Sequence, residues 1–245
     1  MAALAVIGGT GAGLFPHPAE LETVQVEGEW GETSAPVKRW RLYGHEVLFI
    51  ARHGEEGTIA PHRVNYRANI AALKDLGADS IIAINAVGAI AALAAPGQLV
   101  FPDQLIDYTW GREHTYFDGE SGPLNFIDFT KPYDLKLREV LINAAVDRNL
   151  QLLDGAVYGA TQGPRLETAA EIDRLERDGC DIVGMTAMPE AALARELGLP
   201  YASCCIVVNW AAGRSDMAIH DEIAGFLQQG MSQAAEVVDA LVCSL

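Results

Sequence analysis

Glycine-rich and basic residues that could bind an oxyanion follow two apolar runs of this chain. The run at residues 3–7 leads into Gly9 and Thr10, and the run at 46–51 leads into Arg52 and His53. Consecutive glycines let backbone N–H groups approach an anion, and the threonine adds a hydroxyl donor. Arginine and histidine add positive charge and further donors. These residue types predict a site for an oxyanion such as phosphate.

The glycine-rich opening does not match the two common nucleotide-binding loops. In the dinucleotide pattern G-x-G-x-x-G, counted from Gly9, the last glycine is replaced by Leu14. The phosphate loop of nucleoside triphosphatases ends in Gly-Lys-Ser/Thr, but the first lysine of this chain is Lys38. A simple anion cradle and a tight turn without a ligand both remain open for this stretch alone.

Polar or small residues also follow other apolar runs that we expect to be strands. In α/β sheets, ligands bind at the edge where the carboxyl ends of parallel strands meet. One strand end followed by polar or small residues is typical of an ordinary turn. Six strand ends of this kind together favour a pocket. The further residues at these ends include Asn85, Ala86, Met185, Thr186 and Asn209.

The order of the segments predicts an α/β fold. Apolar runs bounded by turn residues alternate with helical segments, and the hairpin signal at Tyr43–His45 leads into the second run. We expect one domain over residues 1–245, with a central mixed β-sheet flanked by helices. The predicted strands are 3–7, 46–52, 80–86, 98–107, 154–161, 181–185 and 201–209. The predicted helices are 63–76, 134–149, 167–178, 189–197 and 220–245.

The composition argues against several classes of function. The chain has 245 residues and a formal net charge of −16 at pH 7, which opposes binding to nucleic acid. It has no apolar run of about 18 residues and no basic signal segment, so we expect no membrane span and a cytoplasmic protein. The 4 cysteines form no C-x-x-C pattern and no compact cluster of metal ligands occurs, so we expect buried thiols and no metal. A serine nucleophile is disfavoured because no G-x-S-x-G motif is present.

Motifs along the chain resemble the trimeric purine nucleoside phosphorylase and methylthioadenosine phosphorylase family. The resemblance covers residues 4–240 and rests on IGGTG, ARHG, VNYRAN, INAVGAI, TQGPRLET, VGMTAMPEAALARELGLPYA and VVNWAAG. The segments LIDYTWGREHTYF and IDFTKPYD are most similar to the bacterial branch that acts on S-methyl-5'-thioinosine. The resemblance implies the family's fold, a homotrimer, and a reaction without a cofactor. In that reaction phosphate, as co-substrate, displaces a purine from C1' of a nucleoside.

The resemblance also implies roles for individual residues. The catalytic residues would be Asn209, Glu167 and His53. The phosphate-binding residues would be Gly9, Thr10, Arg52, His53, Asn85, Ala86 (through its N–H) and Thr186. The nucleoside-binding residues would be Met185 under the ribose, with Leu166, Glu167, Asn209, Ala211 and His220. The segment 112–117 would reach the site of a neighbouring subunit.

Two positions indicate which purine base the site would accept. This chain resembles a family whose methylthioadenosine branch has an Asp-x-Asp pair. At those two positions this chain has Asn209 and Ala211. An asparagine amide can donate to O6 of a 6-oxopurine, and its carbonyl can accept from a protonated N7. Glu167 can accept from the purine N1–H, which adenine lacks, although it also suits the start of a helix. We therefore favour hypoxanthine-type bases over adenine.

The substituent at the 5' position is less constrained by the sequence. A 5'-hydroxyl would suit His220, whereas a 5'-methylthio group would suit the apolar Met217 or Ile219. His62 is a further candidate for the pocket. We expect a methylthioinosine phosphorylase, with methylthioadenosine and inosine or guanosine phosphorylases as alternatives. A non-catalytic nucleoside-binding protein and a nucleoside hydrolase are the alternatives from other classes.

Overall fold

The computed structural model describes residues 3–18, 21–119 and 123–245, and its main feature is a mixed sheet of 11 strands. These strands are β1 (Ala3–Gly8), β2 (Glu22–Val24), β5 (Val37–Leu42), β6 (His45–Ala51), β7 (Ala78–Ala89), β8 (Leu99–Phe101), β9 (Gln104–Asp107), β10 (Leu152–Asp154), β11 (Val157–Ala160), β12 (Ile182–Gly184) and β13 (Tyr201–Trp210). The main path is β10-β8-β13-β7-β1-β6-β5-β2, and β12, β11 and β9 continue from β7. β3 (Glu27–Gly28) and β4 (Gly31–Glu32) form a separate small hairpin. The mixed sheet confirms the predicted fold class.

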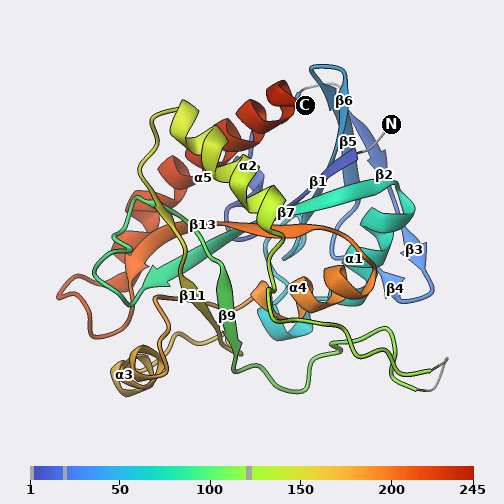
Figure 1. The fold of residues 1–245 in the computed structure, drawn as a ribbon. Coiled ribbons are helices and arrows are strands. Elements are labelled where there is room, and N and C mark those ends of the chain that lie inside the picture. The colour runs from blue at the N-terminus through green and yellow to red at the C-terminus, as the bar shows by residue number, and fades with distance from the viewer. Residues whose placement is uncertain (1–2, 19–20, 120–122) are drawn as a thin grey trace.

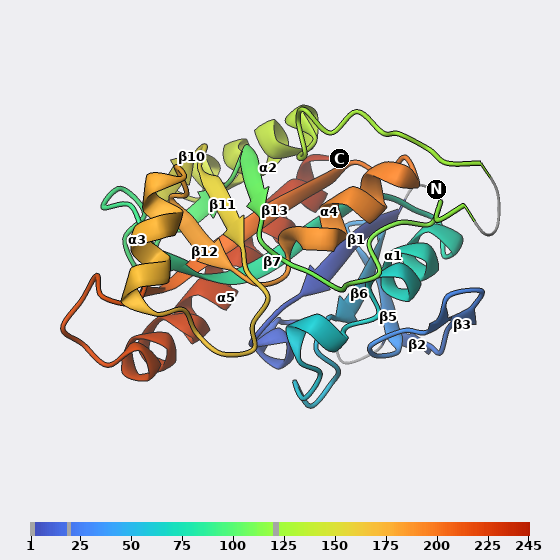
Figure 2. The same ribbon diagram turned by 90° about the horizontal axis from the view of Figure 1, so that it is seen from below.

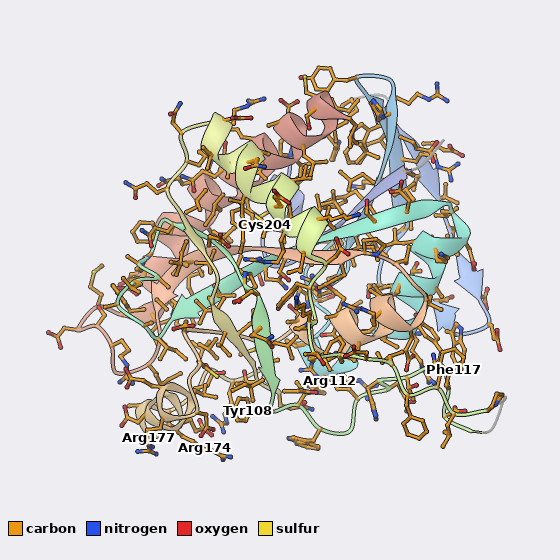
Figure 3. The ribbon with its side chains drawn as sticks, viewed as in Figure 1. Tyr108, Arg112, Phe117, Arg174, Arg177 and Cys204 are labelled. Carbon is orange, nitrogen blue, oxygen red and sulfur yellow. The ribbon has the colours of Figure 1, made fainter. Side chains whose placement is uncertain are left out.

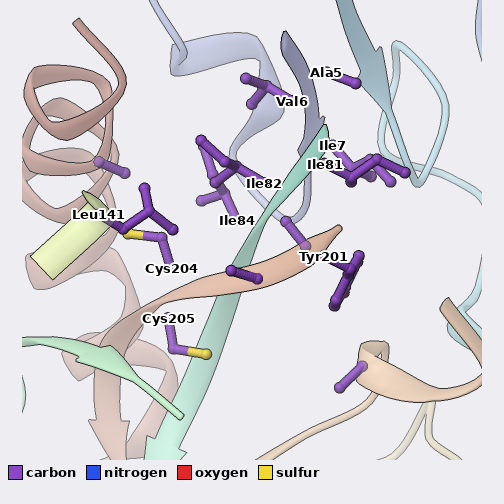
Figure 4. Packing of buried hydrophobic residues seen from close by; sticks show 14 of the residues in the cluster. Ala5, Val6, Ile7, Ile81, Ile82, Ile84, Leu141, Tyr201, Cys204 and Cys205 are labelled. Atoms are coloured by element: carbon purple, nitrogen blue, oxygen red, sulfur yellow. The ribbon is translucent and has the colours of Figure 1, made fainter. Parts of the chain in front are cut away.

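The centre of the sheet is parallel and buried. β6, β1, β7 and β13 lie side by side in parallel, and every residue of β1 is buried. Continuous apolar runs suit such strands because both faces of a parallel sheet are covered. Figure 1 shows β7 and β13 crossing the middle of the molecule. Figure 4 shows Cys204 and Cys205 pointing to opposite faces of β13, so both thiols lie in the core.

All five predicted helices form, with boundaries close to those expected. They are α1 (Tyr66–Asp75), α2 (Leu135–Asp147), α3 (Ala169–Arg177), α4 (Ala187–Glu196) and α5 (Ile219–Ser244). The side chains of Asn65, Asp134 and Thr168 each accept a hydrogen bond from an N–H of the first turn. Met188 has an extended backbone (φ −117°, ψ 138°), so regular helix in α4 begins at Pro189, as predicted. α2 and α5 cover one face of the central strands, and α1 and α4 cover the other (Figures 1 and 2).

One predicted strand is divided, and five strands lie wholly or largely outside the predicted set. The run 98–107 becomes β8 and β9, separated at Pro102, whose ring nitrogen cannot donate to a strand ladder. The run 154–161 contains β11 but only the last residue of β10, Asp154, and Gly155, which has φ 85°, separates the two strands. β2 to β5 were not expected because their segment is largely polar. The predicted hairpin is confirmed, since β5 pairs with β6 across Tyr43 and Gly44.

A gap beside β7 creates the space for a site. β1 pairs with β7 as far as Ala83, and β12 pairs with it from Gly88 onwards. Among the described strands, none pairs with residues 84–87 of β7 on that side. β7 therefore continues past Asn85 instead of ending there, as the sequence had suggested. Gly9 follows the end of β1 and Arg52 follows the end of β6, and both lie beside Ile84 at this gap.

Candidate active site

A cavity of about 460 Å³ lies at this gap. It brings together residues that follow β1 and β6 with residues of β7, β12, β13 and the start of α5. Most of the residues that the sequence predicted for the site line it. Those lining residues are Gly9, Thr10, Arg52, His53, Ala86, Leu166, Glu167, Met185, Thr186, Asn209 and Ala211. His220, His62 and Asn85 are absent from the lining.

At one end of the cavity, Gly9 makes a close approach of backbone to the site possible. A β-carbon at this position would come within 2.7 Å of the Ile84 carbonyl oxygen and 2.8 Å of Arg52 Nη1. Only glycine fits there without moving the backbone. Thr10 follows directly and is exposed to the cavity. The turn therefore offers main-chain N–H groups and one hydroxyl to an anion.

Arg52 is completely buried, yet it lines the cavity. Its Nε and Nη2 donate to the two carboxylate oxygens of Glu190, at 2.7 and 2.8 Å, and its Nη1 donates to the Ile84 carbonyl at 3.1 Å. The carboxylate raises the pKa of the guanidinium against the effect of burial, so Arg52 stays charged. Sequence reasoning missed Glu190. The one available signal was that a buried arginine needs a buried acid.

His53 sits next to Arg52 in a neutral state at neutral pH. Its Nδ1 lies 2.8 Å from the Ile59 carbonyl oxygen, which can only accept, so the proton is on Nδ1. Burial, and then the charge of Arg52, lower the pKa of the imidazole. The neutral ring leaves Nε2 as an acceptor. This nitrogen can take a proton from phosphate or from a sugar hydroxyl.

Thr186 contributes a hydroxyl to the wall of the cavity. Its Oγ1 accepts a hydrogen bond from Nδ2 of Asn85 at 2.9 Å, deep in the core. Asn85 therefore lies behind Thr186 and orients its hydroxyl. The neighbouring Ala86 does line the cavity, in the part of β7 that has no strand partner on this side.

Away from Ile84, where β7 reaches Gly88, the cavity is lined by a carboxylate and an amide. Oε1 of Glu167 accepts a hydrogen bond from the Thr161 hydroxyl at 2.6 Å, which fixes the side chain just before α3. Nδ2 of Asn209 donates to the Trp210 carbonyl at 2.7 Å. One amide hydrogen and the carbonyl oxygen of Asn209 remain available. The pairing of β13 with β7 is irregular between Val207 and Asn209, which places the asparagine at the cavity wall.

The side of the cavity near the start of α5 is apolar. Ile219 and Ile223 line it, whereas His220 is exposed on the same helix and does not. Glu222 fixes this end of α5, since its carboxylate accepts from the Trp210 N–H at 2.8 Å and from the Ser215 hydroxyl at 3.0 Å. The sequence left open whether His220 or an apolar residue, Met217 or Ile219, faces the 5' position. In the structure, the helix presents Ile219 to the cavity.

Arg112 joins two walls of the cavity within its own chain. Its guanidinium donates to the carbonyls of Thr161 and Gln162 on one side and to those of Met185 and Met188 on the other. Figure 3 marks it below the central strands. These bonds lock the segment that carries Glu167 against the one that carries Met185 and Thr186. Loop residues 57–61, which the sequence did not suggest, also line the cavity.

Among the residues that the structure describes, no three His, Cys, Asp or Glu side chains are grouped so as to hold a metal ion. Over the same described ranges, no helix combines the length and apolarity that crossing a membrane requires. The 4 cysteines are all free thiols.

Comparisons with known proteins extend over most of the chain. The profile of the family described as "Phosphorylase superfamily" matches residues 3–242. A probable S-methyl-5'-thioinosine phosphorylase of Xylella fastidiosa is 53% identical over 216 residues, which are 88% of this chain and 87% of that protein. The 6-oxopurine nucleoside phosphorylase of Pyrococcus furiosus is 41% identical over 248 residues, covering 99% and 92%. The structure of methylthioadenosine phosphorylase from Schistosoma mansoni in complex with tubercidin superimposes with a TM-score of 0.92 at 28% identity, covering 100% and 91%.

Proposed function

Since the chain belongs to the phosphorylase superfamily, we propose that its substrate is S-methyl-5'-thioinosine, which it converts with phosphate to hypoxanthine and S-methyl-5-thioribose 1-phosphate. The enzyme is a pentosyltransferase that cleaves a purine nucleoside by phosphorolysis. The single observation that carries the substrate proposal is one cavity in which oxyanion donors lie beside Ile84 of β7, while Glu167 lines the same cavity with Asn209, which pairs with Gly88 farther along β7.

The reaction follows from this polarity of the cavity. An oxygen of phosphate, held by Gly9, Thr10, Arg52 and Thr186, forms a bond to C1' as the bond from C1' to N9 breaks. The electron pair of the broken bond goes to the purine, and the phosphate charge stabilises the developing ribosyl cation. A proton from solvent adds to N7, so that hypoxanthine leaves as the neutral base, and the Asn209 carbonyl oxygen accepts a hydrogen bond from this N7–H. Acid assistance to a leaving group is typically worth about 10²–10⁴-fold in rate.

The base end supports a 6-oxopurine. The Glu167 carboxylate is suited to accept from the purine N1–H, and the free amide hydrogen of Asn209 is suited to donate to O6. Adenine has no N1–H, so binding it would leave a buried acceptor unmatched at a cost of about 1–3 kcal/mol. The relative from Pyrococcus furiosus, named as a 6-oxopurine nucleoside phosphorylase, adds to this support.

The 5' end supports a methylthio group over a hydroxyl. Ile219 and Ile223 give that wall apolar side chains, and the histidine that would bind a hydroxyl, His220, is outside the cavity. Met185 and Leu166 also line the cavity and are suited to pack against the ribose. The 53% identical relative named as a probable S-methyl-5'-thioinosine phosphorylase agrees with this assignment.

The assembly and the compartment are also part of the proposal. The family resemblance supports a homotrimer, and the exposed Trp110, Leu124 and Phe126 supply apolar surface for contact between subunits. Free thiols at Cys180, Cys204 and Cys205, buried in the core, suit the reducing conditions of the cytoplasm.

Omission of phosphate tests the reaction class. We expect turnover of S-methyl-5'-thioinosine to require phosphate, with a sugar 1-phosphate detected by ³¹P NMR. Equal rates without phosphate would identify a hydrolase instead. Binding of the nucleoside without any turnover in phosphate buffer would identify a non-catalytic binding protein.

A further inference from the structure

Glu190 is a buried acid that does not line the cavity, yet it contacts a residue that does. It lies in α4 and is 1% exposed. Its two oxygens accept hydrogen bonds from Arg52, and Oε2 also accepts from the Tyr201 hydroxyl at 2.9 Å. A buried carboxylate with three well-placed donors is held in one position. Its partner guanidinium is therefore held as well.

The donors of Arg52 can be counted. A guanidinium has five N–H groups. Three are used, by the two oxygens of Glu190 and by the Ile84 carbonyl. One hydrogen on Nη1 and one on Nη2 remain. A β-carbon at Gly9 would lie 2.8 Å from Nη1. This side of the guanidinium therefore borders the space beside Gly9 where an anion would bind.

The charge balance makes the direction of these two donors important. Glu190 neutralises the charge of Arg52, and the neighbouring His53 is neutral because burial and Arg52 lower its pKa. The anion end therefore has little net positive charge to attract phosphate from any direction. Phosphate binding must therefore depend on hydrogen-bond donors that are already oriented toward the anion. A guanidinium that is paired with a carboxylate and held in place provides such donors.

We propose that Glu190 is a positioning residue for phosphate: it orients the Arg52 guanidinium so that its two remaining N–H groups point at the bound anion. The inference rests on the proposed function, because it assumes that phosphate occupies this end. It predicts that disturbing Glu190 weakens phosphate binding while leaving the nucleoside end unchanged.

Tyr201 allows the role to be tested without removing the buried charge. Its side chain lies on the same face of β13 as Cys205, toward α4 (Figure 4), and its hydroxyl contacts Glu190 and not the cavity. Tyr201→Phe deletes only this hydroxyl. The ring of Tyr133 stacks on that of Tyr201 with centroids 6.1 Å apart, and the hydrogen bonds of the described residues include none from Tyr133 to Glu190. Tyr133→Phe is therefore the matched control.

The experiment measures KM for phosphate and KM for S-methyl-5'-thioinosine separately, with calorimetric titration of inorganic phosphate into each variant. We expect Tyr201→Phe to raise the phosphate KM by about threefold or more, and Glu190→Gln by about tenfold or more, as expected for hydrogen bonds to charged groups. The nucleoside KM should change less than about twofold in both. Tyr133→Phe should change neither constant.

Several results would overturn the inference. Unchanged phosphate affinity in Tyr201→Phe would do so, and this variant decides the matter if Glu190→Gln fails to fold. Equal rises in both KM values would show a general structural role instead. Full turnover by the wild-type enzyme without phosphate would reject the proposed function itself, which is a distinct result.

Discussion

Gly9 lies so close to Arg52 that a β-carbon on the glycine would come within 2.8 Å of Nη1. The same β-carbon would approach the Ile84 carbonyl oxygen, which Nη1 already binds. The glycine thus lets the N-terminal turn and the guanidinium border one small space. That shared space is where we place phosphate.

Gly9→Ala should abolish most phosphorolysis. The added methyl group would fill the anion cradle and displace Arg52, so we expect kcat/KM for phosphate to fall about 100-fold or more. The matched control is Gly13→Ala, because a β-carbon there meets nothing within 4 Å. Steady-state kinetics with varied phosphate measures the effect. Near-normal phosphate kinetics in Gly9→Ala would place the anion elsewhere.

His53 should make the folded protein less stable in mild acid. Burial and the Arg52 charge lower its pKa in the folded state, so below about pH 6.5 the unfolded chain takes up a proton that the folded state resists. The free energy of unfolding therefore falls as pH drops from about 6.5 toward the folded pKa, and above 6.5 His53 contributes nothing.

Denaturation of wild type and His53→Gln at several pH values checks this effect. The variant should lose less stability than wild type between about pH 7.5 and 5.5, because it lacks this proton uptake. Parallel pH profiles for the two proteins would show that the imidazole is not held neutral by the fold.

Asn209→Asp should shift the choice of base toward adenine. A carboxylate cannot donate to O6 but can accept from an adenine amino group. We expect the ratio of kcat/KM for methylthioinosine over methylthioadenosine to fall about tenfold or more. Unaltered selectivity in this variant would refute the assignment of Asn209 to base recognition.

Ile219→Ser should reduce the preference for a 5'-methylthio group. Loss of apolar contact in such a pocket typically changes selectivity by about 10-fold or more, so the preference for methylthioinosine over inosine should decrease. His220→Ala is the matched control, since this neighbour on α5 is outside the cavity. A stronger effect at His220 than at Ile219 would indicate that the helix presents its other face to the nucleoside.

Much of the site could be predicted because local signals determine it. The helices have capping residues such as Asn65, Asp134 and Thr168, and residues that follow parallel strands must meet at one edge of the sheet. That rule brought Thr10 and His53 together in the cavity.

The unpredicted features depend on contacts between distant segments. Glu190 is 138 residues from Arg52 in the chain, and nothing near either residue indicates their pairing. The gap beside β7 depends on where β12 joins it, about a hundred residues later in the chain. Which residue of α5 faces the cavity depends on how Glu222 fixes the helix to β13.

The most direct test of the central claim is a comparison of kcat/KM for S-methyl-5'-thioinosine, S-methyl-5'-thioadenosine, inosine and guanosine in saturating phosphate. We predict that methylthioinosine is the preferred substrate, by about tenfold or more over each of the others. A preference for inosine would contradict the apolar 5' wall formed by Ile219 and Ile223. A preference for methylthioadenosine would contradict base recognition by Glu167 and Asn209.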